Sequence, residues 1–189
     1  MQGVNFLRTL LSVFPLFGLL TLSTSCRSMG KPEALPDSPV RITELHYHPS
    51  REQGEAEFIE ITNVSDKKVD LSGWSVTGAK PVKLPQGTML EPGESLVVCA
   101  HEGTIRRLWG KNVKVAGEFQ GKLKNSGETV RILDPKGGVA DEAVYSDSVE
   151  GLTKADGGGF SLHRKVFDSE TTSWVAGEPT PGIYSQETR

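Results

Sequence analysis

The 189-residue sequence has only two cysteines, Cys26 and Cys99, so it cannot be a small scaffold held together by several disulfides. Its longest apolar run, residues 10–22, is about 13 residues, whereas a membrane-spanning helix needs about 20. Positive charge is also scarce, since 21 basic residues face 24 acidic ones. The overall charge therefore gives no indication of a nucleic-acid partner, and we expect none.

The sequence lacks the short motifs of the common catalytic and nucleotide-binding sites. It contains no glycine-rich phosphate loop, no nucleophile elbow and no paired carboxylates in an evident pocket. Ser161 and His163 lie two residues apart on a predicted strand and point to one face. Because such a pair has no third group to orient the imidazole, we predict no catalytic residues, no enzyme activity and no cofactor.

One arrangement resembles a metal-binding set. Glu44, His46 and His48 alternate along a predicted strand and would share a face. Residues 141–150 add carboxylates that would suit a weak surface calcium ion, but they do not form a calcium-binding loop. Solvated side chains are the commoner reason for both patterns, so we predict no metal site.

The first 25 residues have the character of a signal peptide. Arg8 is their only charged residue, and the apolar run at 10–22 has the length of a signal-peptide core. The small residues of 23–25 lead directly into Cys26, which resembles the bacterial lipobox, although Ser23 stands where an aliphatic residue is usual. The resemblance implies cleavage between Ser25 and Cys26 and a diacylglycerol on the Cys26 thiol. The alternative is a soluble secreted protein cleaved nearby.

Residues 26–39 are expected to form a lipid-anchored flexible linker. The segment contains three prolines and no hydrophobic periodicity, and a chain of this kind extends up to about 40 Å. If Cys26 is acylated, Cys99 has no disulfide partner, and its apolar surroundings predict an inert buried thiol. If Cys26 is not acylated, a Cys26–Cys99 disulfide stays open.

From Val40 onward the pattern is one of short strands separated by turns, with no room for a parallel α/β sheet. Residues 57–64 alternate, with Phe58, Glu60 and Thr62 on one side and Ile59, Ile61 and Asn63 on the other. Trp74 and Trp174 are expected to fill the core. One helical turn is expected at 103–109, and strands are expected at 41–48, 57–64, 69–77, 94–100, 117–123, 128–133, 139–145 and 160–164.

Six phrases occur in a recognisable order along this region. They are ITEL at 42–45, EFIEITN at 57–63, VDLSGW at 69–74, KNSGETVRILD at 124–134, DGGGFSLHR at 156–164, and Trp174 followed by PTPG at 179–182. Together they resemble the lamin tail domain family. The resemblance implies an all-β, immunoglobulin-like β-sandwich over residues 40–184, followed by a short tail at 185–189.

The resemblance implies an interaction module and leaves the ligand open. We predict a non-enzymatic binding module, anchored to a bacterial membrane through Cys26, with an unknown envelope protein or polysaccharide as partner. The long loop at 146–159 is the expected contact surface, because loops of a sandwich commonly carry its binding sites. A structural envelope scaffold and a metal-dependent adhesin are the alternatives, and the oligomeric state stays open.

Overall fold

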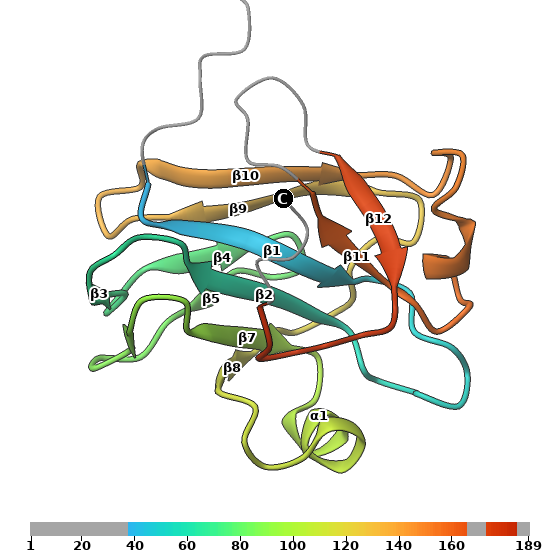
Figure 1. The fold of residues 1–189 in the computed structure, drawn as a ribbon, viewed down its shortest axis with the longest axis horizontal. Coiled ribbons are helices and arrows are strands. Elements are labelled where there is room, and N and C mark those ends of the chain that lie inside the picture. Colours follow the sequence, from blue (N-terminus) through green and yellow to red (C-terminus); the bar gives the residue numbers. More distant parts are fainter. Residues whose placement is uncertain (1–37, 166–172, 185–189) are drawn as a thin grey trace, which may run out of the picture. The chain divides into compact units, whose positions relative to one another are not determined.

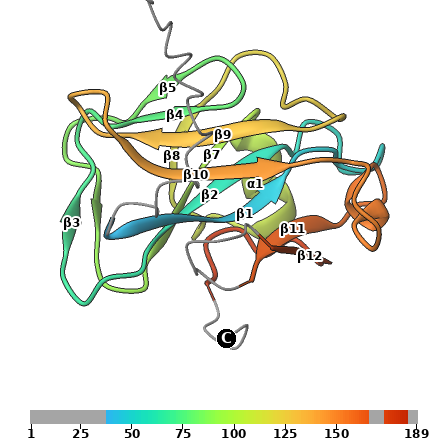
Figure 2. The same cartoon turned by 90° about the horizontal axis from the view of Figure 1, so that it is seen from above.

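The computed structural model describes residues 38–165 and 173–184. In these residues a six-stranded sheet and a four-stranded sheet pack face to face, with a small two-stranded sheet beside them (Figure 1). Figure 2, turned by 90°, shows β9 and β10 of one sheet lying over β1 and β2 of the other. The expected immunoglobulin-like β-sandwich is confirmed.

The six-stranded sheet is built from both ends of the described chain. All of its neighbouring strands are antiparallel except β7 and β8, which are parallel. Its strands, in spatial order, are β12 (Trp174–Gly177), β11 (Ser161–Arg164), β1 (Val40–His46), β2 (Phe58–Asn63), β7 (Ser95–Cys99) and β8 (Val115–Glu118).

The remaining elements form the second layer and its connections. The four-stranded sheet consists of β10 (Val139–Tyr145), β9 (Glu128–Leu133), β4 (Ser75–Thr77) and β5 (Val82–Lys83). The smaller sheet pairs β3 (Val69–Asp70) with β6 (Met89–Leu90). One α-helix, α1 (Glu102–Trp109), and one 3-10 turn, η1 (Thr153–Ala155), complete the described elements.

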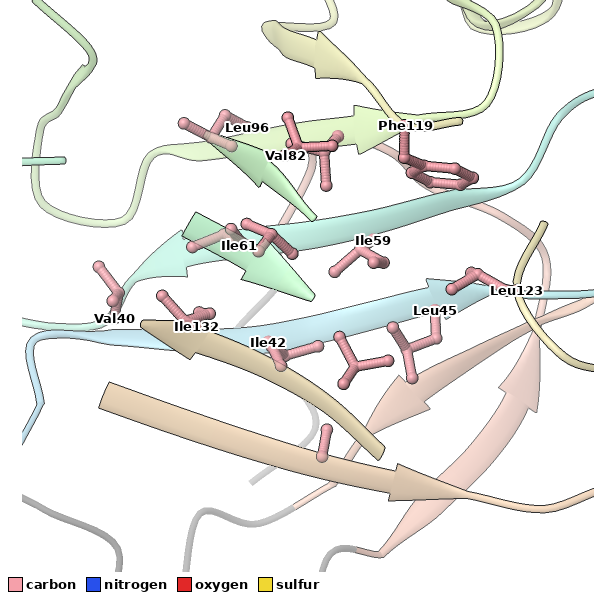
Figure 3. Close-up of a cluster of buried hydrophobic side chains, with 14 of the residues drawn as sticks. Val40, Ile42, Leu45, Ile59, Ile61, Val82, Leu96, Phe119, Leu123 and Ile132 are labelled. Carbon is pink, nitrogen blue, oxygen red and sulfur yellow. The ribbon is translucent and has the colours of Figure 1, made fainter. Parts of the chain in front are cut away.

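The main core lies between the two large sheets. Alternate residues of β1 and β2, such as Leu45 and Ile59, point into it, and Ile132 of β9 meets them from the other layer (Figure 3). These three side chains are at most 2% exposed, and burying each one contributes about 1.5–3 kcal/mol. Trp74 and Trp174 are partly buried and pack against this core, as predicted.

The outer face of the six-stranded sheet is buried as well. Phe58 of β2 and Val97 of β7 point outward and pack beneath Ile105 of α1. Cys99 belongs to the same cluster and is a fully buried free thiol, which confirms the prediction of a core cysteine. The helix therefore covers a second, smaller core.

A buried ion pair joins the two large sheets at one edge. Asp141 of β10 accepts a hydrogen bond from the backbone N–H of Ile42 at 2.7 Å, next to a bulge in β1. Its Oδ2 also accepts from Nη1 of Arg164 at 2.6 Å. The carboxylate of Asp141 thus links β1 to β10, two strands that belong to different sheets.

Two predicted strands differ clearly from the observed ones, and the short strands β5, β6 and β12 were not predicted. The predicted strand 69–77 is split into β3 and β4, because the chain turns at Gly73, where φ is +74°. The predicted strand 117–123 is wrong in its limits: β8 lies at Val115–Glu118, and the chain turns again at Gly121 with φ +84°.

Candidate functional site

Three loops meet at one end of the sandwich. His46 of β1 pairs with Phe58 of β2, and Tyr145 of β10 pairs with Glu128 of β9. These pairs place the same ends of four strands together. The loop end is defined by the connections that leave there, residues 47–57, 119–127 and 146–160.

The amino-terminal end of β1 lies at the opposite end of the sandwich, called here the Ser38 end. There Val40 pairs with Asn63, and β10 leaves its turn at Val139 opposite Leu133. In Figure 1 the blue strand β1 starts at this end and points toward the orange loop that follows β10. The two ends are therefore separated by the length of β1.

Hydrogen bonds hold two of the loops together at the loop end. Nδ1 of His48 lies 2.5 Å from Oδ1 of Asp156, which follows η1. The backbone N–H of Gly157 donates to the carbonyl of His48 at 3.0 Å. Gln53 Nε2 donates to the carbonyl of Gly159 at 2.9 Å. The loop after β1 is thus fixed to the 146–160 loop, which contains residues 146–159 that the sequence indicated as the contact surface.

A polar cleft of about 330 Å³ opens beside these contacts. Arg51 and Lys122 are exposed and belong to different loops. The cleft is lined by His48, Pro49, Ser50, Arg51, Gly54, Glu55, Glu57, Lys122 and Asn125.

A buried carboxylate lies in the wall of the cleft. Glu57 is 5% exposed, and its Oε2 accepts a hydrogen bond from the backbone N–H of Leu123 at 2.7 Å. Burial raises the pKa of Glu57, while the Leu123 N–H and the nearby Lys122 oppose that shift. Glu57 thereby fixes the 119–127 loop against the start of β2.

The cleft can recognise a ligand through hydrogen bonds and charge. It offers cationic donors from Arg51 and Lys122, carboxylates from Glu55 and Glu57, and the amide of Asn125. The sequence did not indicate that these residues share a cleft, because they come from two loops about 70 positions apart. Only the 146–160 loop was indicated, through its length and composition.

The three residues that resemble a metal-binding set in the sequence do not come together in the structure. His46 is buried on the outer face, where Nδ1 lies 2.9 Å from the carbonyl of Ala56. His48 lies beyond the end of β1 and contacts Asp156, while Glu44 contacts Ser161. Within residues 38–165 and 173–184, no group of three or more metal-binding side chains is brought together.

The Ser161–His163 pair has a third group that the sequence interpretation did not include. Ser161 Oγ donates to Glu44 Oε1 at 2.5 Å and lies 3.0 Å from His163 Nε2. The sequence did not indicate this carboxylate, which comes from β1. The geometry still differs from a nucleophile–base–carboxylate relay, because the buried hydroxyl donates to the carboxylate itself and Glu44 approaches the same ring nitrogen, Nε2, at 3.7 Å.

Ser25 and Cys26, the predicted cleavage and lipidation residues, lie outside the described residues, as do the signal peptide and most of the linker. Burial raises the pKa of the Cys99 thiol to about 12, so Cys99 lacks the thiolate character of a reactive cysteine. In the part of the chain that the structure describes, no helix is both long enough and apolar enough to cross a membrane.

Residues 34–147 match the family model of the lamin tail domain. No curated protein matches the chain significantly. The match ends before β11, β12 and the PTPG phrase, yet both strands lie in the same sheet as β1. The family is one of structural, immunoglobulin-like domains and not of enzymes. With more than half of its length matched and with the sandwich observed, the chain belongs to the lamin tail domain family.

Proposed function

We propose that this chain is an exported binding module, held at a bacterial membrane by a lipid on Cys26, which presents its loop end to an envelope ligand. The observation that supports this most directly is the direction of β1. The strand starts at the Ser38 end, next to the predicted linker, and finishes beside the cleft. An anchor attached through the linker therefore leaves the cleft at the far end of the sandwich.

The distances suit this arrangement. The seven residues of β1 span about 20 Å at the usual rise of a strand. An extended linker of residues 27–39 adds up to about 40 Å. A linker of that reach would allow the cleft to lie outside the layer of lipid headgroups.

The chemistry of the cleft favours a polar ligand. Its lining combines donors and acceptors within one cleft of about 330 Å³, and its one aromatic ring is the polar imidazole of His48. A polysaccharide with hydroxyl and carboxylate groups, or a polar peptide segment, would match these groups. The His48–Asp156 and Gln53–Gly159 contacts hold the loops in place, which lowers the entropy lost on binding.

The test compares charge reversals at the two ends of the sandwich. Arg51→Glu and Lys122→Glu change the cleft, whereas Lys67→Glu and Lys136→Glu change equally exposed lysines at the Ser38 end. Immobilised envelope polysaccharide and solubilised envelope protein are tested separately, each with and without a chelator. We expect the two cleft variants to lose at least tenfold in affinity for one of these probes, and the two control variants to bind like the unchanged protein.

Point substitutions are preferable to a deletion in the 146–160 loop. Leu152 and Ala155 are 6% and 0% exposed and belong to the main core, so removing them would unfold the sandwich. If neither fraction binds the unchanged chain, or if all four variants bind equally, the loop end is not the binding surface. A partner that crosslinks in fixed stoichiometry, and whose crosslinking is the same in the cleft variants, would indicate a scaffold instead. Binding that is lost only when the chelator is present would indicate a metal-dependent adhesin.

A further inference from the structure

The segment after β12, residues 178–184, lies on the outer face of the six-stranded sheet and is called the strap. It runs from the end of β12 back across β2 (Figure 1). Pro179 and Pro181 are buried against the sheet. Thr180 between them is half-buried and faces β1.

Two carboxylates provide most of the polar contacts to the strap. Glu44 accepts from the backbone N–H of Thr180 and from its Oγ1, each at 3.0 Å. Glu60 accepts from the backbone N–H of Gly182 at 2.8 Å. The sheet therefore recognises the strap mainly through its backbone, by the carboxylates of two neighbouring strands.

These two carboxylates are direct cross-strand partners. Glu44 of β1 pairs with Glu60 of β2, and each residue is 1% exposed. Like charges at directly opposite positions of a sheet repel each other. Hydroxyl groups of the sheet donate to the pair as well: Ser161 donates to Glu44 Oε1, which also accepts from the Thr180 N–H, and Thr43 donates to Glu60 Oε1, both at 2.5 Å.

The basic side chains near the pair come from β11 and β1. His163 Nε2 lies 3.7 Å from Glu44 Oε1, but burial lowers the pKa of His163, which favours its neutral form. Arg164 lines the same small cavity of about 40 Å³, and its Nη1 donates to Asp141 on β10. His46 of β1 lies on the same face, and burial lowers its pKa to about 4. Tyr184 of the strap lines the cavity as well.

Burial raises the pKa of Glu44 to about 7, although the hydrogen bonds from Ser161 and Thr180 oppose the shift. Burial together with the charge of Glu44 raises the pKa of Glu60 to about 7, although the hydrogen bonds from Thr43 and Gly182 oppose the shift. We call the form with the strap in place the closed form and the form with the strap displaced, and the pair hydrated, the open form. The pair therefore binds protons more tightly in the closed form than in the open form, in which a glutamate has a pKa near 4.5. A carboxyl with a raised pKa stabilises the closed form below pH 4.5, and this contribution is lost as the pH rises through 7. The lowered pKa values of His46 and His163 act in the opposite direction, destabilising the fold as the pH falls below 6.5.

We propose that Glu44 and Glu60 form a proton-dependent binding site for the strap, which is closed while the pair holds a proton and opens as both carboxylates become charged. A doubly charged pair requires water, and water reaches it when the strap leaves the cavity. The N–H groups of Thr180 and Gly182 are then released together. This site lies on the outer sheet face and does not depend on the proposed ligand cleft.

The test is amide hydrogen–deuterium exchange of the full chain, followed by NMR from pH 6 to pH 8 and corrected for the intrinsic exchange rate. We expect the protection of the Thr180 and Gly182 amides to fall about tenfold for each carboxyl that ionises. The Leu71 amide, which donates to the Thr88 carbonyl at 2.8 Å and has no histidine at that contact, serves as an internal reference whose protection should stay constant.

Three variants test whether the fall in protection comes from Glu44 and Glu60 or from another buried carboxyl. Glu60→Gln keeps an acceptor for Gly182 and should remove about half of the logarithmic fall in protection, and the double variant E44Q/E60Q should remove all of it. Glu57→Gln alters another buried glutamate away from the strap and should leave the fall unchanged. Protection that is constant with pH in the unchanged chain overturns the proposal even if a variant fails to fold. An undiminished fall in E44Q/E60Q overturns it too.

Discussion

Buried ionisable side chains lie on both faces of the six-stranded sheet. Asp141 and Arg164 lie between the two large sheets, and His46 and Glu60 lie on the outer face. Burial penalises the charged form of each group, so it raises the pKa of a carboxyl and lowers that of an imidazole. Whether a charge persists then depends on what each side chain contacts, and Asp141 has the close cationic partner that Glu60 lacks.

Asp141→Asn is expected to destabilise the fold strongly. The substitution keeps the size of the side chain but removes the negative charge that Arg164 faces at 2.6 Å, where both side chains are at most 2% exposed. Breaking a buried ion pair in this way costs about 3–5 kcal/mol. Urea unfolding at pH 7 measures the loss.

The matched control is the next residue of the same strand. Glu142 pairs with Arg131 at 2.6 Å, but these side chains are 37% and 43% exposed, and such pairs contribute less than about 1 kcal/mol. Glu142→Gln should therefore have a small effect. Equal losses in Asp141→Asn and Glu142→Gln would contradict a buried link between the sheets.

His46→Phe is expected to reduce the sensitivity of the fold to acid. Burial lowers the pKa of His46 from 6.5 to about 4, so the unfolded chain takes up a proton that the folded chain does not. The stability associated with neutral His46 is complete above pH 6.5 and is lost as the pH falls toward 4. At pH 5 this loss is about 2 kcal/mol relative to pH 7.5.

Phenylalanine keeps a ring between Phe58 and Trp109, which flank His46. The free energy of unfolding, measured at pH 7.5 and pH 5, should differ less in His46→Phe than in the unchanged chain. His101→Asn changes an exposed histidine and retains a cap for α1, and its pH dependence should stay unchanged. If both variants keep the full loss at pH 5, His46 is not responsible for it.

At the level of single residues, the sequence predicted which side chains share a face but not which faces are covered. The alternation of β2 placed Phe58 and Glu60 together, and they do share the outer face. An acidic residue on such a face normally indicates solvent. Glu60 is buried because Gly182, more than a hundred residues later, contacts it, and no local pattern encodes that contact.

Among the elements, the long alternating strands were the most predictable. β9 and β10 have the limits that alternation and flanking turns predicted, residues 128–133 and 139–145. β12 was missed because its four residues, Trp174–Gly177, show no clear alternation and owe their extended form to pairing with β11. Its Trp174 Nε1 also donates to the carbonyl of Val144 on β10 at 2.8 Å.

Helix α1 was predicted from three apolar positions, and it covers part of the outer face. Ile105→Ala should cost about 2–5 kcal/mol, because Ile105 is fully buried against β2 and β7 and alanine would leave a cavity. Thermal and urea unfolding measure this loss. Arg107→Ala, an exposed position of the same helix, should change stability by less than about 0.5 kcal/mol. Similar effects of the two substitutions would mean that α1 does not seal a core.

For the whole molecule, the structure extends the domain beyond the family match. The match ends at Asp147, but β11 lies beside β1 and the strap is bound by Glu44 and Glu60. The last of the six phrases, PTPG, is part of the strap. The cleft was not predictable in the same way, since its residues are brought together only by strand register.

The central claim is that an anchor at one end of the sandwich presents a binding cleft at the other. The most direct measurement is the intact mass of the mature chain from membrane and soluble fractions, for the unchanged protein and for Cys26→Ala. We predict a membrane-bound chain that begins at Cys26 and carries the mass of a diacylglycerol, and release of the Cys26→Ala chain into the soluble fraction. An unmodified mass in the soluble fraction would contradict the anchored module.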